Sequence, residues 1–228
     1  MTASPFPLSQ PLAVTGMRAR SRSRDLLEVV VGFGLIVGVI WSPEHLQKIL
    51  TPFVFVITFA LVLTRRRGYD DLGLGRRGLV ESLWILPAAI GLALVSMWVA
   101  AKFGLLHPLY QADFRHIAGY VLWTIYQQLL LQVLFVPRLR RLLLNDGAAV
   151  SVAGALFAAA HLPNLTLTAA TLIWGLASCS AFLRYRNVWA LGLAQGLLGL
   201  CFSICVPDAL HHHLRVGLGY LHYHSTAR

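Results

Sequence analysis

Seven runs of apolar residues, separated by short polar or charged segments, divide most of the chain. They span residues 26–42, 48–64, 79–102, 116–136, 148–162, 166–183 and 188–206. A straight transmembrane helix needs about 20 residues, so the shorter runs indicate tilted helices or helices partly sunk in the bundle. The runs lack the strict alternation that is typical of membrane strands. The pattern predicts an all-α, polytopic membrane helix bundle of about seven transmembrane helices.

Basic residues lie in clusters between the runs and predict an orientation. With the N-terminus inside, the inside segments hold fourteen of the 19 Lys and Arg residues and the outside segments hold five. This distribution satisfies the positive-inside rule. We therefore expect an integral protein of a bacterial inner (cytoplasmic) membrane with a cytoplasmic N-terminus. Six or eight spans are alternatives, and either would move the C-terminus to the other side.

The composition agrees with a membrane protein. The 228-residue chain is 57% hydrophobic and 12% charged, about half the charged fraction of a soluble domain, and its mean hydropathy is +0.67. A net charge of +10 could suggest nucleic acid, but arginines placed between apolar runs favour membrane loops. We expect the lipid bilayer, and no nucleic acid, as a partner. The cysteines Cys179, Cys201 and Cys205 lie in apolar runs without a CxxC pair, so no disulfide framework is predicted.

The sequence divides into three parts. Residues 1–25 are rich in Pro, Ser and Arg and form a predicted cytoplasmic basic tail, because no apolar core of signal-peptide length precedes the arginines. Residues 26–206 form the bundle. Residues 207–228 form a His-rich segment, predicted to be extracytoplasmic or interfacial. Its three consecutive histidines would point in different directions on a helix and cannot all bind one ion, so no metal site is predicted and packing with Tyr220 and Tyr223 at the interface is favoured.

Polar side chains occur deep inside three of the runs. Counted at about 1.5 Å per helical residue from the neighbouring inner loop, the depth is on the order of 15 Å for Gln128, roughly 20 Å for His161 and about 12 Å for Gln195. Polar groups at membrane depth cost free energy unless they are paired. The similar depths therefore predict one shared polar cluster.

Local spacing supports the cluster. Thr124, Gln128 and Gln132 follow one another at intervals of four and share a helix face, and Phe157 and His161 have the same interval. Pro163 ends or bends the helix after His161, and Asn164 can cap the next one. Hydrogen bonds between membrane helices contribute about 1 kcal/mol each without any chemistry, so a purely structural role for these residues stays open.

The spacing of these residues resembles that of the CAAX protease and bacteriocin-processing (CPBP, or Abi) family of intramembrane endopeptidases. The family pattern is EExxxR on one span, FxxxH on the next, and a later HxxxN. The corresponding stretches here are Gln127-Gln128-xxx-Gln132, Phe157-xxx-His161 and Gln195-xxx-Gly199. The resemblance covers residues 70–206, and "FAAAHLPN" is its most specific piece. It implies a site in which paired glutamates and histidines activate a water for attack on a peptide bond.

The departures from the family pattern change the expected chemistry. Glutamine occupies both glutamate positions, Gln127 and Gln128, and one histidine position, Gln195, whereas Gly199 occupies the asparagine position; His161 keeps its family identity. A carboxamide cannot accept a proton from water at ordinary pH, and glutamine is a poor ligand for zinc. All nine acidic residues fall in loops or at the ends of runs. We therefore expect proteolysis to be absent, or weakened by about two to four orders of magnitude.

Three functions remain open at this point. The first is a non-proteolytic binding or scaffold subunit, whose neutral pocket holds a lipid, a prenyl chain, a pigment, a lipidated peptide or a membrane-protein partner. The second is an active hydrolase that uses His161 as the base, with water positioned by the glutamines. The third is a structural membrane protein with only a fold-level resemblance. The predicted site comprises Gln127, Gln128, His161 and Gln195 at the family positions, with Thr124, Gln132, Phe157 and Asn164 lining the cavity.

Overall fold

The computed structural model describes residues 10–63, 72–76, 78–110 and 112–223, and within these ranges it is helical and contains no strand. This confirms the predicted all-α bundle. The elements in chain order are α1 (Gln10–Ile40), α2 (Glu44–Leu63), α3 (Leu79–Ser82), α4 (Ile85–Lys102), α5 (Phe114–Leu129), the π-helical segment η1 (Leu130–Phe135), α6 (Val136–Leu143), α7 (Asp146–Ala159), α8 (Leu165–Tyr185), α9 (Val188–Cys205), α10 (Asp208–His211), the 3-10 segment η2 (His212–Leu214) and α11 (Gly217–Leu221).

Five helical stretches are long and apolar enough to cross a membrane, which agrees with a polytopic protein. They are Glu44–Leu63, Leu79–Lys102, Phe114–Leu143, Leu165–Tyr185 and Val188–Cys205. The helix Asp146–Ala159 is apolar but shorter. The count of seven spans stays a prediction.

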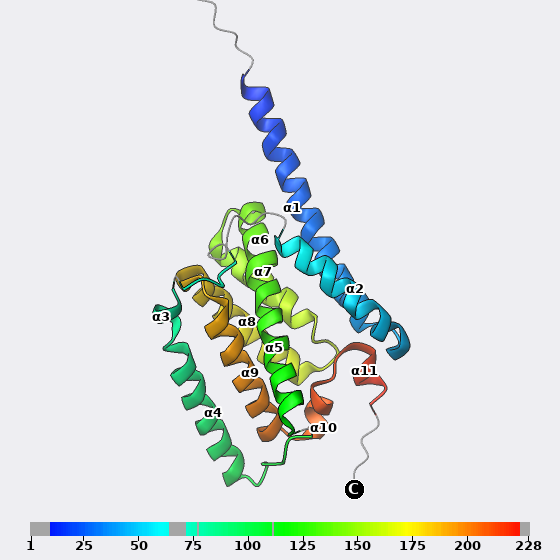
Figure 1. Cartoon of the computed structure of the whole chain (residues 1–228), viewed down its shortest axis with the longest axis vertical. Helices are drawn as coiled ribbons and strands as arrows, with labels where there is room; N and C mark the ends of the chain where they lie inside the picture. The colour runs from blue at the N-terminus through cyan, green and yellow to red at the C-terminus, as the bar shows by residue number, and fades with distance from the viewer. Residues whose placement is uncertain (1–9, 64–71, 77, 111, 224–228) are drawn as a thin grey trace, which may run out of the picture.

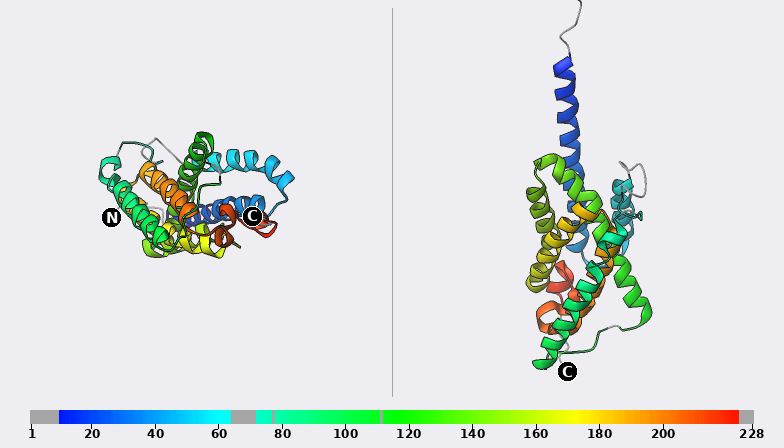
Figure 2. Two further views of the ribbon diagram at one scale, coloured as in Figure 1. Left: turned by 90° about the horizontal axis from the view of Figure 1, so that it is seen from below. Right: turned by 90° about the vertical axis from the view of Figure 1, so that its left-hand side faces the viewer.

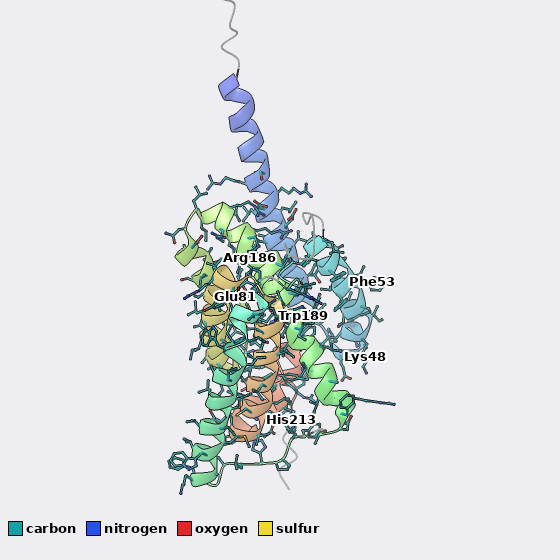
Figure 3. The ribbon with its side chains drawn as sticks, turned by 60° about the vertical axis from the view of Figure 1, so that its left-hand side comes forward. Lys48, Phe53, Glu81, Arg186, Trp189 and His213 are labelled. Atoms are coloured by element: carbon teal, nitrogen blue, oxygen red, sulfur yellow. The ribbon has the colours of Figure 1, made fainter. Side chains whose placement is uncertain are left out.

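The helices form a body around α9 and a separate pair at its side. Helix α9 packs on α4 and α5, and α7 packs on α8. The pair α1–α2 joins this body through α6 and η1. Helices α2 and α4 lie on opposite sides of the molecule, and α1 projects beyond the bundle (Figures 1 and 2). The outward face of α2 is apolar, as the exposed Phe53 shows (Figure 3), which is typical of a surface in contact with lipid.

Helix α1 is longer than the apolar run that predicted it. Because α1 begins at Gln10, the predicted boundary between the tail (1–25) and the bundle falls inside a continuous helix. Asp25 and Glu28 therefore lie within a helix instead of at its end, and both are buried. Arginines of α6 make this burial tolerable: Arg141 binds Asp25 at 2.8 Å and Arg138 binds Glu28 at 2.6 Å.

Some predicted features lie outside the described residues. They are the first nine residues of the tail, Arg65, Arg66, Arg67, Asp70, Asp71, Arg77, His224 and Arg228.

A glycine-rich connection attaches the start of the α3–α4 span to the α8–α9 turn. The backbone N–H of Val188 donates to the carbonyl of Gly73 at 2.9 Å, and the indole N–H of Trp189 (labelled in Figure 3) donates to Leu74. Gly78 has a φ of 67°, and a Cβ there would lie 1.7 Å from the carbonyl oxygen of Tyr185. Only glycine fits this approach, which explains the glycine that directly precedes the span at position 78.

Candidate functional site

Four glutamines from two helices form a continuous hydrogen-bonded chain at the centre of the bundle. Gln132 on η1 donates to Gln128 at 2.9 Å, and Gln128 donates to Gln195 on α9 at 2.6 Å. Gln195 in turn donates to Gln127 at 2.5 Å. Gln128 and Gln132 are completely buried. The structure therefore brings together Gln128 and Gln195, two of the three residues that depth counting placed at one level. The third, His161, is hydrogen-bonded to the carbonyl of Phe157 and not to these glutamines.

Trp174 on α8 determines the direction of this chain. Its indole N–H donates to Gln195 Oε1 at 3.1 Å, and an indole nitrogen can only donate. Gln195 Oε1 is thus the acceptor end of its carboxamide, so its Nε2 must donate to Gln127 Oε1. The Nε2 group of Gln127 is then left as a donor at the end of the chain.

The other end of the chain is less well satisfied. Gln132 Nε2 also donates to Ser178 Oγ on α8 at 3.3 Å. Gln132 Oε1 is buried and has no hydrogen-bond partner among the residues that the structure describes. The buried network therefore ends on an acceptor without a partner in the described part of the chain. Gln132 stands at the position of the arginine in the family pattern.

Small residues let α9 approach α5 closely enough for these contacts. A Cβ at Gly192 would lie 2.7 Å from Ile125, and one at Gly196 would lie 3.1 Å from the Thr124 hydroxyl. Close backbone approach through small residues is the usual way in which membrane helices associate. Thr124 strengthens the contact because its hydroxyl donates to the carbonyl of Gly192 at 2.9 Å.

The π-helical segment η1 interrupts the helix that carries three of the glutamines. It includes Gln132 and begins two residues after Gln128. Single π turns within α-helices often occur at functional sites because they change which side chains face a neighbouring element. Here all six residues of η1 are buried, and Gln132 points to Ser178 of α8 while it contacts Gln128.

His161 follows the last turn of α7 and is buried. Its Nδ1 lies 2.7 Å from the carbonyl oxygen of Phe157, and the two rings form an edge-to-face pair. A carbonyl can only accept, so Nδ1 carries the proton and, in the neutral ring, Nε2 is an acceptor. No hydrogen bond joins Nε2 to another described residue.

A cavity of about 870 Å³ lies between the α1–α2 pair and the body of the bundle. Its walls are mostly aliphatic and aromatic, with Phe33 and Ile36 from α1, Phe55 from α2 and Phe202 from α9 among them. Among the described residues, no Asp, Glu, Lys or Arg lines it. The volume lies near the upper end of the range for small-molecule sites, about 300–1,000 Å³, so the cavity can hold one sizeable apolar molecule.

Comparison with known families identifies the segment that carries this site. Residues 112–201 match the model of the family Type II CAAX prenyl endopeptidase Rce1-like. The family resemblance expected from the sequence is thereby confirmed over this segment. No curated protein and no solved structure gives a significant match. With its five candidate spans, the chain is an integral membrane protein with a CAAX-protease-like segment.

The predicted site residues divide between the wall of the cavity and the layer behind it. Gln127, Phe157, His161 and Gln195 line the cavity. The others, Thr124, Gln128, Gln132 and Asn164, are buried and are not among its lining residues. Asn164 instead caps α8 and donates to the carbonyl of His211 at 2.8 Å, which attaches the C-terminal segment to the bundle.

Tyr120 occupies the space beside Gly199, the residue at the family asparagine position. A Cβ at Gly199, the family asparagine position, would lie 2.0 Å from the hydroxyl of Tyr120. The phenol therefore fills the space of the missing side chain. Tyr120 also lines the cavity.

Sequence reasoning missed the groups that orient the glutamines. Trp174 and Ser178 have no signature of their own, although their spacing of four residues in an apolar run is a signal for two side chains on one face. The pairing of Glu28 with Arg138 was also missed. Asp25 and Glu28, three residues apart at the start of an apolar run, are a comparable signal.

Proposed function

We propose that this chain is a non-proteolytic membrane protein that binds an apolar molecule in its central cavity, as a binding or scaffold subunit. The observation that carries the proposal is the hydrogen-bonded carboxamide chain at the positions of the family's catalytic glutamates. The cavity it borders has no carboxylate among its described lining residues.

The hydrogen bonding of the glutamines argues against a hidden catalytic role. Proteolysis by this family requires a group that takes a proton from water, and a carboxamide does not do so. Gln127 Oε1, Gln128 Oε1 and Gln195 Oε1 all accept hydrogen bonds from protein groups. These oxygens are thus engaged within the protein, and two of the three bonds join α5 to α9.

The cavity supports an apolar occupant. Its size and walls suit a lipid tail, a prenyl chain, a pigment, or the apolar part of a lipidated peptide or partner helix. Helices α1 and α2 form one wall of the cavity. Its lining residues Phe55, Trp123 and Ile173 are also exposed, so an occupant drawn from the bilayer can enter beside them.

A second function is favoured by one observation. The unpaired Nε2 of His161 belongs to a residue that lines the cavity, and a neutral imidazole nitrogen can act as a general base. An active hydrolase would then use His161 with a water held by the amide of Gln127.

A cleavage assay separates the two functions. The purified protein is incubated with prenylated and unprenylated peptides, beside the variants His161→Ala and Gln127→Glu/Gln128→Glu/Gln195→His. We expect no cleavage by the native chain. The triple variant tests whether restoring the family residues restores activity in the same cavity.

The outcomes point in different directions. Cleavage by the native chain that His161→Ala abolishes would contradict the binding function and establish the hydrolase. Absence of native cleavage, together with a hydrocarbon ligand that co-purifies and is lost on filling the cavity with Ala177→Trp, would support binding. Ala177 lines the cavity and lies outside the glutamine chain.

We also propose that the protein lies in a bacterial inner membrane with its N-terminus in the cytoplasm. The distribution of basic residues along the sequence supports this orientation.

A further inference from the structure

The cavity presents one donor whose role is set by the protein. Trp174 donates to Gln195 Oε1, and Gln195 Nε2 donates to Gln127 Oε1. The oxygen of Gln127 is therefore the acceptor of its carboxamide, and Gln127 Nε2 can only donate. Gln127 is partly exposed and lines the cavity. No protein acceptor for Nε2 occurs among the described residues, so this donor is available to a ligand.

The cavity also presents acceptors whose role is set by the protein. One is Gln47 Oε1, because Gln47 Nε2 donates to the carbonyls of Ile40 and Ser42; the other belongs to His161. The carbonyl of Phe157 requires the proton of neutral His161 to lie on Nδ1. Nε2 then offers a lone pair, and His161 lines the same cavity. A ligand that donates a hydrogen bond would pair with this nitrogen.

Several other polar side chains on the wall are already engaged. The hydroxyls of Thr51, Ser96 and Thr171 each donate to a carbonyl four residues earlier in their own helix. The hydroxyl of Tyr120 can either donate or accept and so does not discriminate between ligands.

The absence of charged side chains from the described wall limits the ligand further. An ionised carboxylate, phosphate or ammonium group would lose its hydration without gaining an opposite charge, and this is costly in an apolar site. The fitting head group is neutral, accepts one hydrogen bond and donates another.

We propose that the ligand is a neutral hydrocarbon chain that ends in a hydroxyl group. Its oxygen accepts from Gln127 Nε2, and its O–H donates to His161 Nε2. This inference rests on the binding function proposed above and adds the chemistry of the head group. The hydrocarbon chain occupies the space between α1, α2 and α9, among Phe33, Phe55 and Phe202.

A series of probes with one chain length tests the two hydrogen bonds separately. The native protein in lipid nanodiscs is loaded with a fluorescent alkyl probe, which is displaced by hexadecanol, by its methyl ether and by hexadecane. The ether accepts but does not donate, and the alkane does neither. We expect the alcohol to bind about fivefold more tightly than the ether, and the ether about fivefold more tightly than the alkane, because each hydrogen bond contributes about 1 kcal/mol. Palmitate and hexadecylamine, charged at neutral pH, should bind more weakly than the alcohol.

Two variants assign each difference to a residue. His161→Leu should abolish the preference for alcohol over ether and leave that for ether over alkane. Gln127→Met should have the converse effect. His45→Leu is the matched control, because His45 is exposed on α2 and does not line the cavity. If a variant fails to fold, the series on the native chain still tests the proposal.

The outcomes separate this inference from the function on which it rests. Equal displacement by alcohol, ether and alkane, or tightest binding of palmitate, would overturn the hydroxyl assignment and leave the binding function intact. If the protein takes up neither the fluorescent probe nor any of the unlabelled hydrocarbon compounds, both the hydroxyl assignment and the binding function are wrong.

Discussion

Gln195 joins the buried Gln128 to Gln127 on the wall of the cavity. Its Oε1 accepts from Gln128 and Trp174, and its Nε2 donates to Gln127. Replacing any one partner by its family counterpart therefore changes a hydrogen bond whose direction is already set. We therefore expect a single exchange toward the family pattern to be unfavourable unless its partner is exchanged with it.

This consistency predicts a strong coupling between two positions. In Gln128→Glu, a carboxylate oxygen would face Gln195 Oε1, because the present contact of 2.6 Å uses the Gln128 donor. We expect a loss of about 1–3 kcal/mol in the free energy of unfolding. Adding Gln195→His should recover part of this loss, since an imidazole N–H can donate to the carboxylate. Unfolding in mixed micelles measures the double-mutant cycle, and additive losses would show that the two side chains are not coupled.

Gly199 is the second position where a family residue should not fit. Gly199→Ala should destabilise the protein by about 1–3 kcal/mol through overpacking against Tyr120, and Tyr120→Leu should relieve this loss. Gly91→Ala on α4 is the control, because a Cβ there meets no atom within 4 Å; it should be neutral or stabilising by up to about 1 kcal/mol. Thermal unfolding of Gly199→Ala, Tyr120→Leu, their combination and Gly91→Ala checks the comparison. Equal effects at both glycines would contradict the close contact.

At the scale of elements, α1 is attached to the bundle by buried charge. Arg138 is 1% exposed, and besides Glu28 it binds the carbonyls of Leu134 and Leu61 at 2.9 Å each. The guanidinium thus connects α6 to both α1 and α2, the two helices that form one wall of the cavity. The position of this wall depends on an ion pair that no hydropathy profile reveals.

Removing one member of the pair should be far worse than removing both. Glu28→Leu leaves Arg138 buried with its charge partly uncompensated, and we expect a loss of about 3–5 kcal/mol. The double variant Glu28→Leu/Arg138→Met should recover most of it. The exposed pair Glu44–Lys48 on α2 serves as control, since Glu44→Gln should leave the stability nearly unchanged. Proteolysis within α1 reports its detachment.

The C-terminal cap, residues 207–221, closes one end of the cavity through Leu214 and Val216. Its residues His212, His213 and Leu214 have φ of 46°, 52° and 59°, a left-handed run that is unfavourable for side-chain-bearing residues. Hydrogen bonds to side chains support this run: the N–H of Leu214 donates to His211 Nδ1 at 3.2 Å, and that of His213 donates to Asp208 at 2.8 Å. His213 lies at this end of the molecule in Figure 3.

The cap should loosen as the pH falls. Burial lowers the pKa of His211 below 6.5. The negative charge of Asp208 opposes this shift without outweighing it, and His107 and His213 add to it. The folded cap therefore binds fewer protons than the unfolded one, so its stability is complete above about pH 6.5 and declines below it. Protonation of Nδ1 would break the bond from Leu214.

A second decline is expected at lower pH. Burial raises the pKa of Asp208, but hydrogen bonds from Tyr223 and His213 and nearby histidine charges outweigh it, so the pKa lies below 3.8. The contribution of Asp208 is present above pH 3.8 and is lost as the pH falls through its lowered pKa. Hydrogen exchange of residues 208–221 measures both steps. His211→Phe should expose the cap at neutral pH and remove the first step, whereas His45→Gln should not; unchanged exchange of the native cap in mild acid would contradict the prediction.

At the scale of the whole molecule, connections gather at two ends of the bundle. The 72–76 segment contacts the α8–α9 turn, and the N–H of Gly217 donates to the carbonyl of Leu162 at 2.9 Å at the opposite end. The sequence assigns the first group of connections to the inside and the second to the outside, so the arrangement is compatible with alternating spans.

Cysteine accessibility tests this orientation. In a Cys179→Ser/Cys201→Ser/Cys205→Ser background, we expect Ser21→Cys to be protected from an impermeant maleimide in intact cells and Leu105→Cys to react. Ser21 and Leu105 are both exposed, so burial in the protein does not confuse the result. Labelling of Ser21→Cys in intact cells would reverse the predicted orientation.

The sequence by itself determined the helical membrane architecture, the positions of the main spans and the resemblance to CAAX proteases. These follow from short-range features: apolar runs must be helical in lipid, because their backbone groups find no other partners. Depth counting also predicted that Gln128, His161 and Gln195 lie at one level, since helical rise is regular.

Only the tertiary structure decided which of these side chains face the cavity and which face each other. That Gln127 lines the cavity while Gln128 is fully enclosed depends on the close contact of α9 with α5 at Gly192 and Gly196, and on the π segment that follows. The direction of the carboxamide chain depends on Trp174, and the burial of Glu28 depends on Arg138. Each is a contact between helices that are distant in sequence, and helical periodicity constrains the face of one helix but not the partner that this face meets.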